Sequence, residues 1–174
     1  ESGREIVLDW TDVHGLHGVQ PMTVGLRVHD DELPAVYSEG LRNETVLLVS
    51  DTLTFQVHAH DDFGVRRMGL SWETIPDPLA SPKPVKGEKL LVAAADGEQA
   101  DLAAEAVFCP ELLKVPAEPI KLSAWCEDAC PGHARACSVA MTVYVMTPEQ
   151  HMIWLTKQLT AWDDEAREVH EREL

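Results

Sequence analysis

Residues 53–65 read LTFQVHAHDDFGV, and this stretch decides the fold class. Apolar and polar residues alternate as far as His60, and the apolar set is Leu53, Phe55, Val57 and Ala59. Successive side chains of a β-strand point to opposite faces of the sheet, so this period of two predicts a strand with one buried face. The stretch ends in Asp61-Asp62-Phe63-Gly64, which are turn formers, and we expect a turn at 61–64 between two strands.

The same rhythm continues on both sides of this stretch. Strands are predicted, from the clearest to the weakest pattern, at 65–73, 120–126, 137–145, 86–94 and 104–109. Met68, Leu70 and Trp72 share one face of the 65–73 strand, and Trp72 is predicted to be a core residue. Many short strands with turn signals between them are typical of two stacked sheets. We therefore expect a mainly β fold, an immunoglobulin-like β-sandwich with a C-terminal α-helix.

An internal similarity suggests a repeat. Ile6-Val7-Leu8 is followed by Met22-Thr23-Val24, and Ile120-Lys121-Leu122 is followed by Met141-Thr142-Val143. Both pairs read as strand, acidic turn, strand, which is how the last two strands of a sandwich are arranged. We predict that residues 1–30 are the terminal hairpin of a preceding, truncated repeat. The alternative is a chance similarity between two ordinary hairpins.

Three further boundaries follow from this interpretation. Residues 31–34 become a short acidic linker that ends in a proline, and residues 35–146 become the complete domain. Neither Glu1 nor Leu174 looks like a natural terminus, so we expect the chain to be a piece of a larger protein.

Residues 147–174 change to a helical period. Thr147 is predicted as the N-cap, Pro148 occupies the first helical position, and Gln150 completes a capping box. Apolar residues then recur at alternating spacings of three and four, which is an a/d coiled-coil seam. This helix seam consists of Met152, Leu155, Leu159, Trp162, Ala166 and Val169. Two interpretations stay open: a coiled coil that mediates self-association or binds a protein, and an amphipathic helix that lies on the sandwich.

The stretch from Thr52 to Val65, together with the hairpin from Ala124 to Val145, resembles bacterial immunoglobulin-like repeats. The matching pattern is an apolar strand, then Asp-Asp-aromatic-Gly-Val, then a strand of alternating apolar residues. Such repeats belong to large envelope-anchored proteins, especially of planctomycete-type bacteria, and the segment 30–34 also resembles the junctions of cadherin-like repeats. The resemblance implies a β-sandwich and an extracytoplasmic location, in the periplasm or at the cell surface, within a membrane-anchored protein. It implies no catalytic residues.

Acidic residues cluster where the linker and the strand-end turns are expected to meet. Calcium prefers six to eight oxygen ligands, and carboxylates supply them. The candidate ligands are Asp30, Asp31, Glu32, Asp61, Asp62 and Asp128. The alternative is that these residues are solvated and simply terminate strands.

The cysteines offer a second candidate site. Cys126, Cys130, His133 and Cys137 have the residue types of a zinc site, and a turn would bring them together. A disulfide between Cys126 and Cys137 is the competing interpretation, because the two residues flank the hairpin and share core-facing parity. A cross-strand bridge is then possible if the register sets their Cβ atoms about 4 Å apart. Unbonded thiols are the third interpretation.

Charge and motif content narrow the function classes. The formal net charge of −16 argues against nucleic acid as a partner, because phosphate backbones would be repelled. No apolar run reaches the length of a bilayer span, and no nucleophile elbow or phosphate loop occurs. We expect a non-enzymatic structural or interaction module without a required cofactor and without membrane contact of its own. The alternatives are calcium-dependent adhesion or recognition of protein or polysaccharide, and a metal site built on the cysteines and histidine.

Overall fold

The computed structural model describes residues 2–77, 83–94 and 99–173. The chain divides into two compact units, Glu1–Glu32 and Leu33–Leu174. The division between Glu32 and Leu33 falls inside the segment 31–34, which the sequence predicts to be a linker.

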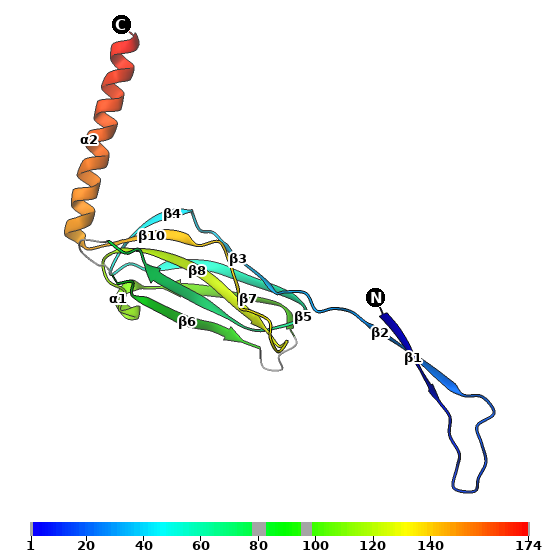
Figure 1. Cartoon of the computed structure of the whole chain (residues 1–174). Coiled ribbons are helices and arrows are strands. Elements are labelled where there is room, and N and C mark those ends of the chain that lie inside the picture. The colour runs from blue at the N-terminus through cyan, green and yellow to red at the C-terminus, as the bar shows by residue number, and fades with distance from the viewer. Residues whose placement is uncertain (1, 78–82, 95–98, 174) are drawn as a thin grey trace. The chain divides into compact units, whose positions relative to one another are not determined.

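The first unit is a single β-hairpin (blue in Figure 1). Its strands β1 (Ser2–Leu8) and β2 (Met22–Val28) pair antiparallel, with Ile6 opposite Val24 and Leu8 opposite Met22. The connecting loop is ordered around Asp12, whose Oδ1 accepts the backbone N–H groups of His14 and Leu16 at 2.8 and 2.9 Å. A carboxylate that accepts nearby backbone N–H groups is a common way to stabilise a tight turn.

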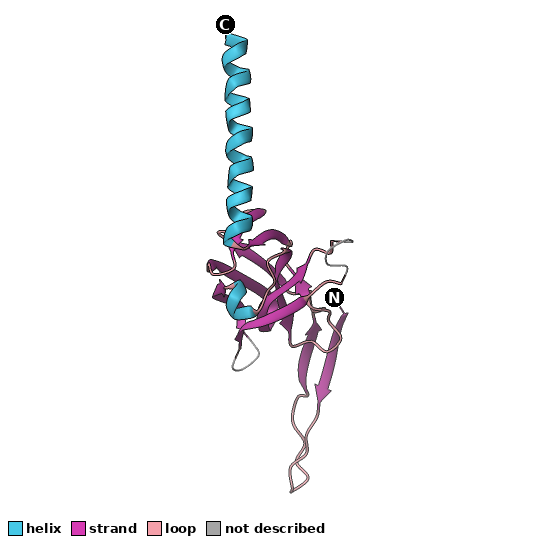
Figure 2. Cartoon of the chain, turned by 90° about the vertical axis from the view of Figure 1, so that its left-hand side faces the viewer, coloured by secondary structure: helices cyan, strands magenta, loops and turns pink. Residues whose placement is uncertain are grey.

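The second unit is mainly β and ends in a long helix (Figures 1 and 2). Within the described residues, eight strands form one curled sheet. These strands are β3 (Ala35–Glu39), β4 (Glu44–Leu48), β5 (Leu53–Thr74), β6 (Lys86–Ala93), β7 (Gln99–Phe108), β8 (Pro119–Asp128), β9 (Ala136–Cys137) and β10 (Met141–Met146). The short helix α1 (Pro110–Leu113) follows β7, and α2 (Pro148–Glu173) follows β10. The mainly β class and the C-terminal helix are thereby confirmed.

The long strand β5 organises this sheet, because its two halves have different neighbours. The first half pairs with β3 and β7, and the second half pairs with β6 and β8. The turn expected at 61–64 is wrong, since the strand continues through it. The turn formers instead produce a bulge, where the pairing with β7 jumps from His60 to Val65 and Gly64 has a φ of 129°. Each half is held by other strands, so the chain bends here without reversing.

The strand predicted at 137–145 is also corrected. It is broken at residues 138–140 into β9 and β10. At the break, the Ser138 hydroxyl accepts the backbone N–H of Ala124 at 3.0 Å, so a side chain replaces part of the ladder. Val139 is exposed although an unbroken strand would place it on the same face as Met141, which is buried.

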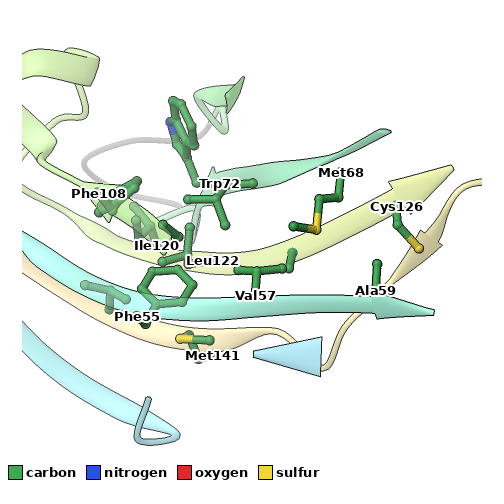
Figure 3. Packing of buried hydrophobic residues seen from close by; sticks show 14 of the residues in the cluster. Phe55, Val57, Ala59, Met68, Trp72, Phe108, Ile120, Leu122, Cys126 and Met141 are labelled. Atoms are coloured by element: carbon green, nitrogen blue, oxygen red, sulfur yellow. The ribbon is translucent and has the colours of Figure 1, made fainter. Parts of the chain in front are cut away.

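The core lies inside the curled sheet and contains the residues that the sequence pattern selected (Figure 3). Phe55, Val57 and Ala59 point inward from the first half of β5, which confirms the predicted buried face. Trp72 of the second half is buried as predicted and packs edge-on against Phe108, with the ring centroids 5.6 Å apart. Such an edge-to-face pair adds to the hydrophobic stabilisation that the burial itself provides.

The start of α2 confirms the predicted capping box. The Thr147 hydroxyl accepts the backbone N–H of Gln150 at 3.2 Å, and the side chain of Gln150 accepts the backbone N–H of Thr147 at 2.8 Å. The interpretation of this helix as one that lies along the sheet is wrong, because most of the helix seam is exposed to solvent. None of the helices in the described part of the chain is both long and apolar enough to cross a membrane.

Candidate functional site

The strand pair β8/β10 repeats the first hairpin in residue type and in register. In β1/β2, Leu8 lies opposite Met22 and Ile6 lies opposite Val24. In β8/β10, Leu122 lies opposite Met141 and Ile120 lies opposite Val143. Four apolar side chains of the same kinds therefore share one face in both strand pairs.

The two strand pairs differ in burial. Ile120 and Leu122 are fully buried, whereas Ile6 and Leu8 are 45% and 46% exposed. We call Ile6, Leu8, Met22 and Val24 the hairpin face. Exposed apolar clusters of this kind commonly mark contact surfaces, so the hairpin face is one candidate interaction surface.

The helix seam is a second candidate surface. Met152, Leu159, Trp162 and Val169 are all exposed, and Ala166 lies among them. Leu155 is half-buried, close to the point where the helix leaves the sheet. The other faces of the helix carry ion pairs four residues apart, such as Arg167 with Asp163 at 2.6 Å. One apolar stripe between charged faces is the pattern of a helix that pairs with another helix.

The bulge in β5 holds a deeply buried carboxylate. Asp61 is only 2% exposed. Its Oδ2 accepts the backbone N–H of Gly64 at 2.6 Å and that of Phe63 at 3.2 Å. Its Oδ1 is buried and receives no hydrogen bond from any residue that the structure describes. A buried oxygen in this state is costly unless something else binds it.

The other predicted calcium ligands differ in whether they lie near Asp61. A carboxylate oxygen of Asp62 lies within 4.8 Å of one of Asp61. Asp128 is buried, and its two oxygens accept the backbone N–H of Cys130 at 3.2 Å and bond to Nδ1 of His133 at 2.6 Å. Asp128 is thus occupied by local contacts. Asp30, Asp31 and Glu32 belong to the first unit, and their part in a calcium site stays a prediction.

The predicted disulfide between Cys126 and Cys137 is wrong for this structure. All four cysteines lie in the described part of the chain, and none is in a disulfide. The break after β9 explains why: Cys126 lies opposite Ala136, while Cys137 lies opposite Trp125. Neighbouring residues on a strand face opposite sides, so Cys126 is buried and Cys137 is exposed.

The predicted four-ligand zinc set does not assemble either. Ligand atoms of Cys130 and His133 lie within 4.8 Å of each other. Cys126 is instead buried in the core, where burial raises the pKa of its thiol from 9.0 to about 11, helped by the charges of Asp61 and Asp128. This thiol is therefore neutral at physiological pH. The pair Cys130 and His133 has the residue types of a soft-metal site, with Asp128 orienting the imidazole.

Sequence reasoning missed how Trp125 is covered. Trp125 is only 2% exposed, and the guanidinium of Arg135 lies 3.8 Å from the centroid of its ring. Glu127 links this layer, because it accepts Nε of Arg67 at 2.6 Å and Nε of Arg135 at 2.9 Å. The hydrogen bond from Arg67, together with that from Arg135, holds the pKa of Glu127 below its usual value despite partial burial. Arg67 faces Glu127 only through the β5/β8 register, which the sequence does not reveal.

Comparison with models of protein families and with curated proteins finds no match to this chain.

Proposed function

We propose that this chain is a non-catalytic, immunoglobulin-like structural or interaction module of a larger extracytoplasmic protein. The strand pairing supports the finer fold assignment. The first half of β5 lies between β3 and β7, and its second half lies between β6 and β8, with β10 beyond β8. Immunoglobulin sandwiches place strands A, B and E in one layer and C, F and G in the other.

On this assignment β3 is strand A, the two halves of β5 are B and C, and β7, β8 and β10 are E, F and G. The order along the chain agrees with that of the fold. The assignment also gives Trp72 the place of the tryptophan that strand C contributes to the core of many such domains.

The observation that carries the functional proposal is the match between β1/β2 and β8/β10. The same four residue types stand in the same register, buried in one pair and largely exposed in the other. We interpret β1/β2 as the terminal hairpin of a preceding repeat. Arrays of such repeats act as spacers or present surfaces, and their function lies in contacts between modules and partners.

The exposed helix seam supports a contact with another protein. A helix that packs against little else gains most of its stability from the partner that covers its apolar face. The proposed partner is a second copy of the chain, which would form a coiled coil through Leu159, Trp162 and their neighbours. The proposal includes no nucleic acid, no direct membrane contact and no catalytic role.

Sedimentation velocity over a range of concentrations tests the self-association. The full chain should form dimers with rising concentration, and Leu159→Asp should abolish them because a charge in the seam is costly to desolvate. Leu112→Asp, the same change at an exposed leucine outside the seam, should leave dimerisation intact. A wild-type chain that stays monomeric throughout, or a Leu159→Asp variant that dimerises equally well, contradicts the proposed coiled coil.

Calcium-dependent adhesion or recognition is the second candidate function, and a specific observation favours it. Oδ1 of Asp61 is buried and unsatisfied at the bulge, and one carboxylate oxygen of Asp61 lies within 4.8 Å of one of Asp62. A metal site on Cys130 and His133 is less favoured, because the remaining two residues of the predicted set do not join them.

A further inference from the structure

The bulge in β5 brings together two carboxylates that a regular strand would separate. Asp61 and Asp62 are adjacent in sequence, and adjacent side chains of a strand normally point to opposite faces. At this bulge, however, one oxygen of each lies within 4.8 Å of the other. Two like charges at this separation repel each other unless a cation or a proton lies between them.

The burial of Asp61 adds an independent observation. Oδ2 already accepts two backbone N–H groups, so the amides of the bulge are directed at one oxygen only. Oδ1 is buried, and no described residue donates a hydrogen bond to it. His60, the residue before Asp61, has its Nδ1 bonded to Asp101 at 2.8 Å.

The ligand chemistry selects the kind of cation. Carboxylate oxygens are hard ligands, which favours calcium or magnesium over the softer metals. Calcium tolerates irregular coordination and takes six to eight oxygens, whereas magnesium demands a near-ideal octahedron. The bulge offers an irregular set, with Asp61 buried and Asp62 exposed to solvent.

We propose that the bulge at residues 61–64 binds a calcium ion through Oδ1 of Asp61 and the carboxylate of Asp62. Water molecules complete the coordination from the solvent side of Asp62. Bound calcium satisfies the buried oxygen, reduces the repulsion between the two carboxylates and fixes the bend at which β5 passes from one set of partners to the other. This site does not depend on the module's role in self-association, so either proposal can fail alone.

Thermal unfolding and calorimetric titration of the full chain test the site. After removal of divalent ions with a chelator, millimolar calcium chloride should raise the melting temperature by about 3–8 °C, as expected for a ligand well above its Kd. Magnesium chloride at the same concentration should have a smaller effect. Asp62→Asn should weaken calcium binding about tenfold or more without unfolding the chain, because Asp62 is exposed.

Asp61→Asn keeps an oxygen for the two backbone N–H groups and should abolish the calcium response. Asp164→Asn, the same change at an exposed helix residue, is the control and should respond as the wild type does. An absent calcium response in the wild type, or an unchanged response in both the Asp61 and Asp62 variants, overturns the site.

Discussion

The two strand pairs β1/β2 and β8/β10 carry equivalent leucine, isoleucine, methionine and valine residues in the same register. In β8/β10 these side chains belong to the core cluster that also contains Phe55, Met68 and Trp72 (Figure 3). In β1/β2 they form the largely exposed hairpin face. The difference shows that local sequence specifies the hairpin and its register, whereas burial depends on strands that come from elsewhere in a domain.

The energetic consequence of this difference is large. Full burial of one leucine or isoleucine contributes about 1.5–3 kcal/mol to stability relative to exposure. The covered pair therefore contributes to the stability of its unit far more than the exposed pair can. Equivalent substitutions in the two pairs measure this directly.

The largest effect is expected from Leu122→Ala. Removal of a fully buried leucine side chain leaves a cavity and should lower the free energy of unfolding by about 2–5 kcal/mol. Leu8→Ala is the matched substitution in the exposed pair and should change stability by about 0.5 kcal/mol or less. Denaturant unfolding of both variants, followed by circular dichroism, measures the difference. Equal losses would show that the hairpin face is covered after all.

Gly69 of β5, which lies opposite Trp125 of β8, and Gly25 of β2 give the next comparison. A Cβ at Gly69 would stand 2.5 Å from the carbonyl oxygen of Lys89 and 2.6 Å from the Trp125 ring, so Gly69→Ala should destabilise the chain by about 1–3 kcal/mol. A Cβ at Gly25 in β2 meets nothing within 4 Å. Gly25→Ala should therefore be neutral or slightly stabilising. A Gly69→Ala chain that melts with the wild type would contradict the close packing of Trp125.

The third comparison concerns charge. The pKa of Glu127 is lower in the folded chain than its usual value of 4.5. Its contacts with Arg67 and Arg135 therefore stabilise the fold at a pH above 4.5, and this stabilisation is lost as the pH falls through the lowered pKa. Glu127→Gln should cost about 1 kcal/mol at neutral pH, since the network is partly exposed, and should flatten the acid limb of the stability profile. Glu5→Gln, on the exposed strand β1, should leave that limb unchanged. If the stability of the wild type and of Glu127→Gln fell in parallel at acid pH, Glu127 would not stabilise the fold through its contacts with the two arginines.

The smallest change in stability is expected from chemical modification of the exposed cysteine. Cys126 is buried with a raised pKa, and Cys137 is exposed on the neighbouring strand. A thiol reagent at neutral pH should modify Cys137 quickly, with little effect on stability, and Cys126 only after unfolding. Rapid modification of Cys126 in the folded chain would contradict the register of β8 and β9.

Much of the fold could be predicted from the sequence because its signals are local. The alternation of Leu53 to Ala59 gives the strand and its buried face, and Thr147 with Gln150 gives the start of the helix. The predictions that were wrong concern positions whose structure depends on residues distant in the sequence. Asp61 to Gly64 have turn chemistry, but β3, β7, β6 and β8 hold the two halves of β5 in one continuous strand.

The candidate sites show the same limit. Cys126 and Cys137 would lie on the same face of the sheet if β9 and β10 formed one continuous strand. The irregularity at Ser138 shifts the pairing, so that Cys126 lies opposite Ala136 and Cys137 faces the other side. Asp61 could be named as a ligand candidate from its residue type, yet its burial and unsatisfied oxygen follow from the bulge. The layer over Trp125 could not be predicted from the sequence, because it depends on the cross-strand register that places Arg67 opposite Glu127.

Hydrogen exchange of the backbone amides tests most directly whether the two equivalent strand pairs differ in tertiary cover. The amides of β8 and β10 should exchange only through global unfolding, whereas those of β1 and β2 should exchange through local opening, orders of magnitude faster. The peptide that contains Ile120 to Leu122 and the one that contains Ile6 to Leu8 provide the comparison. Equal protection in both peptides would contradict the account, because it would mean that the hairpin already has its covering layer.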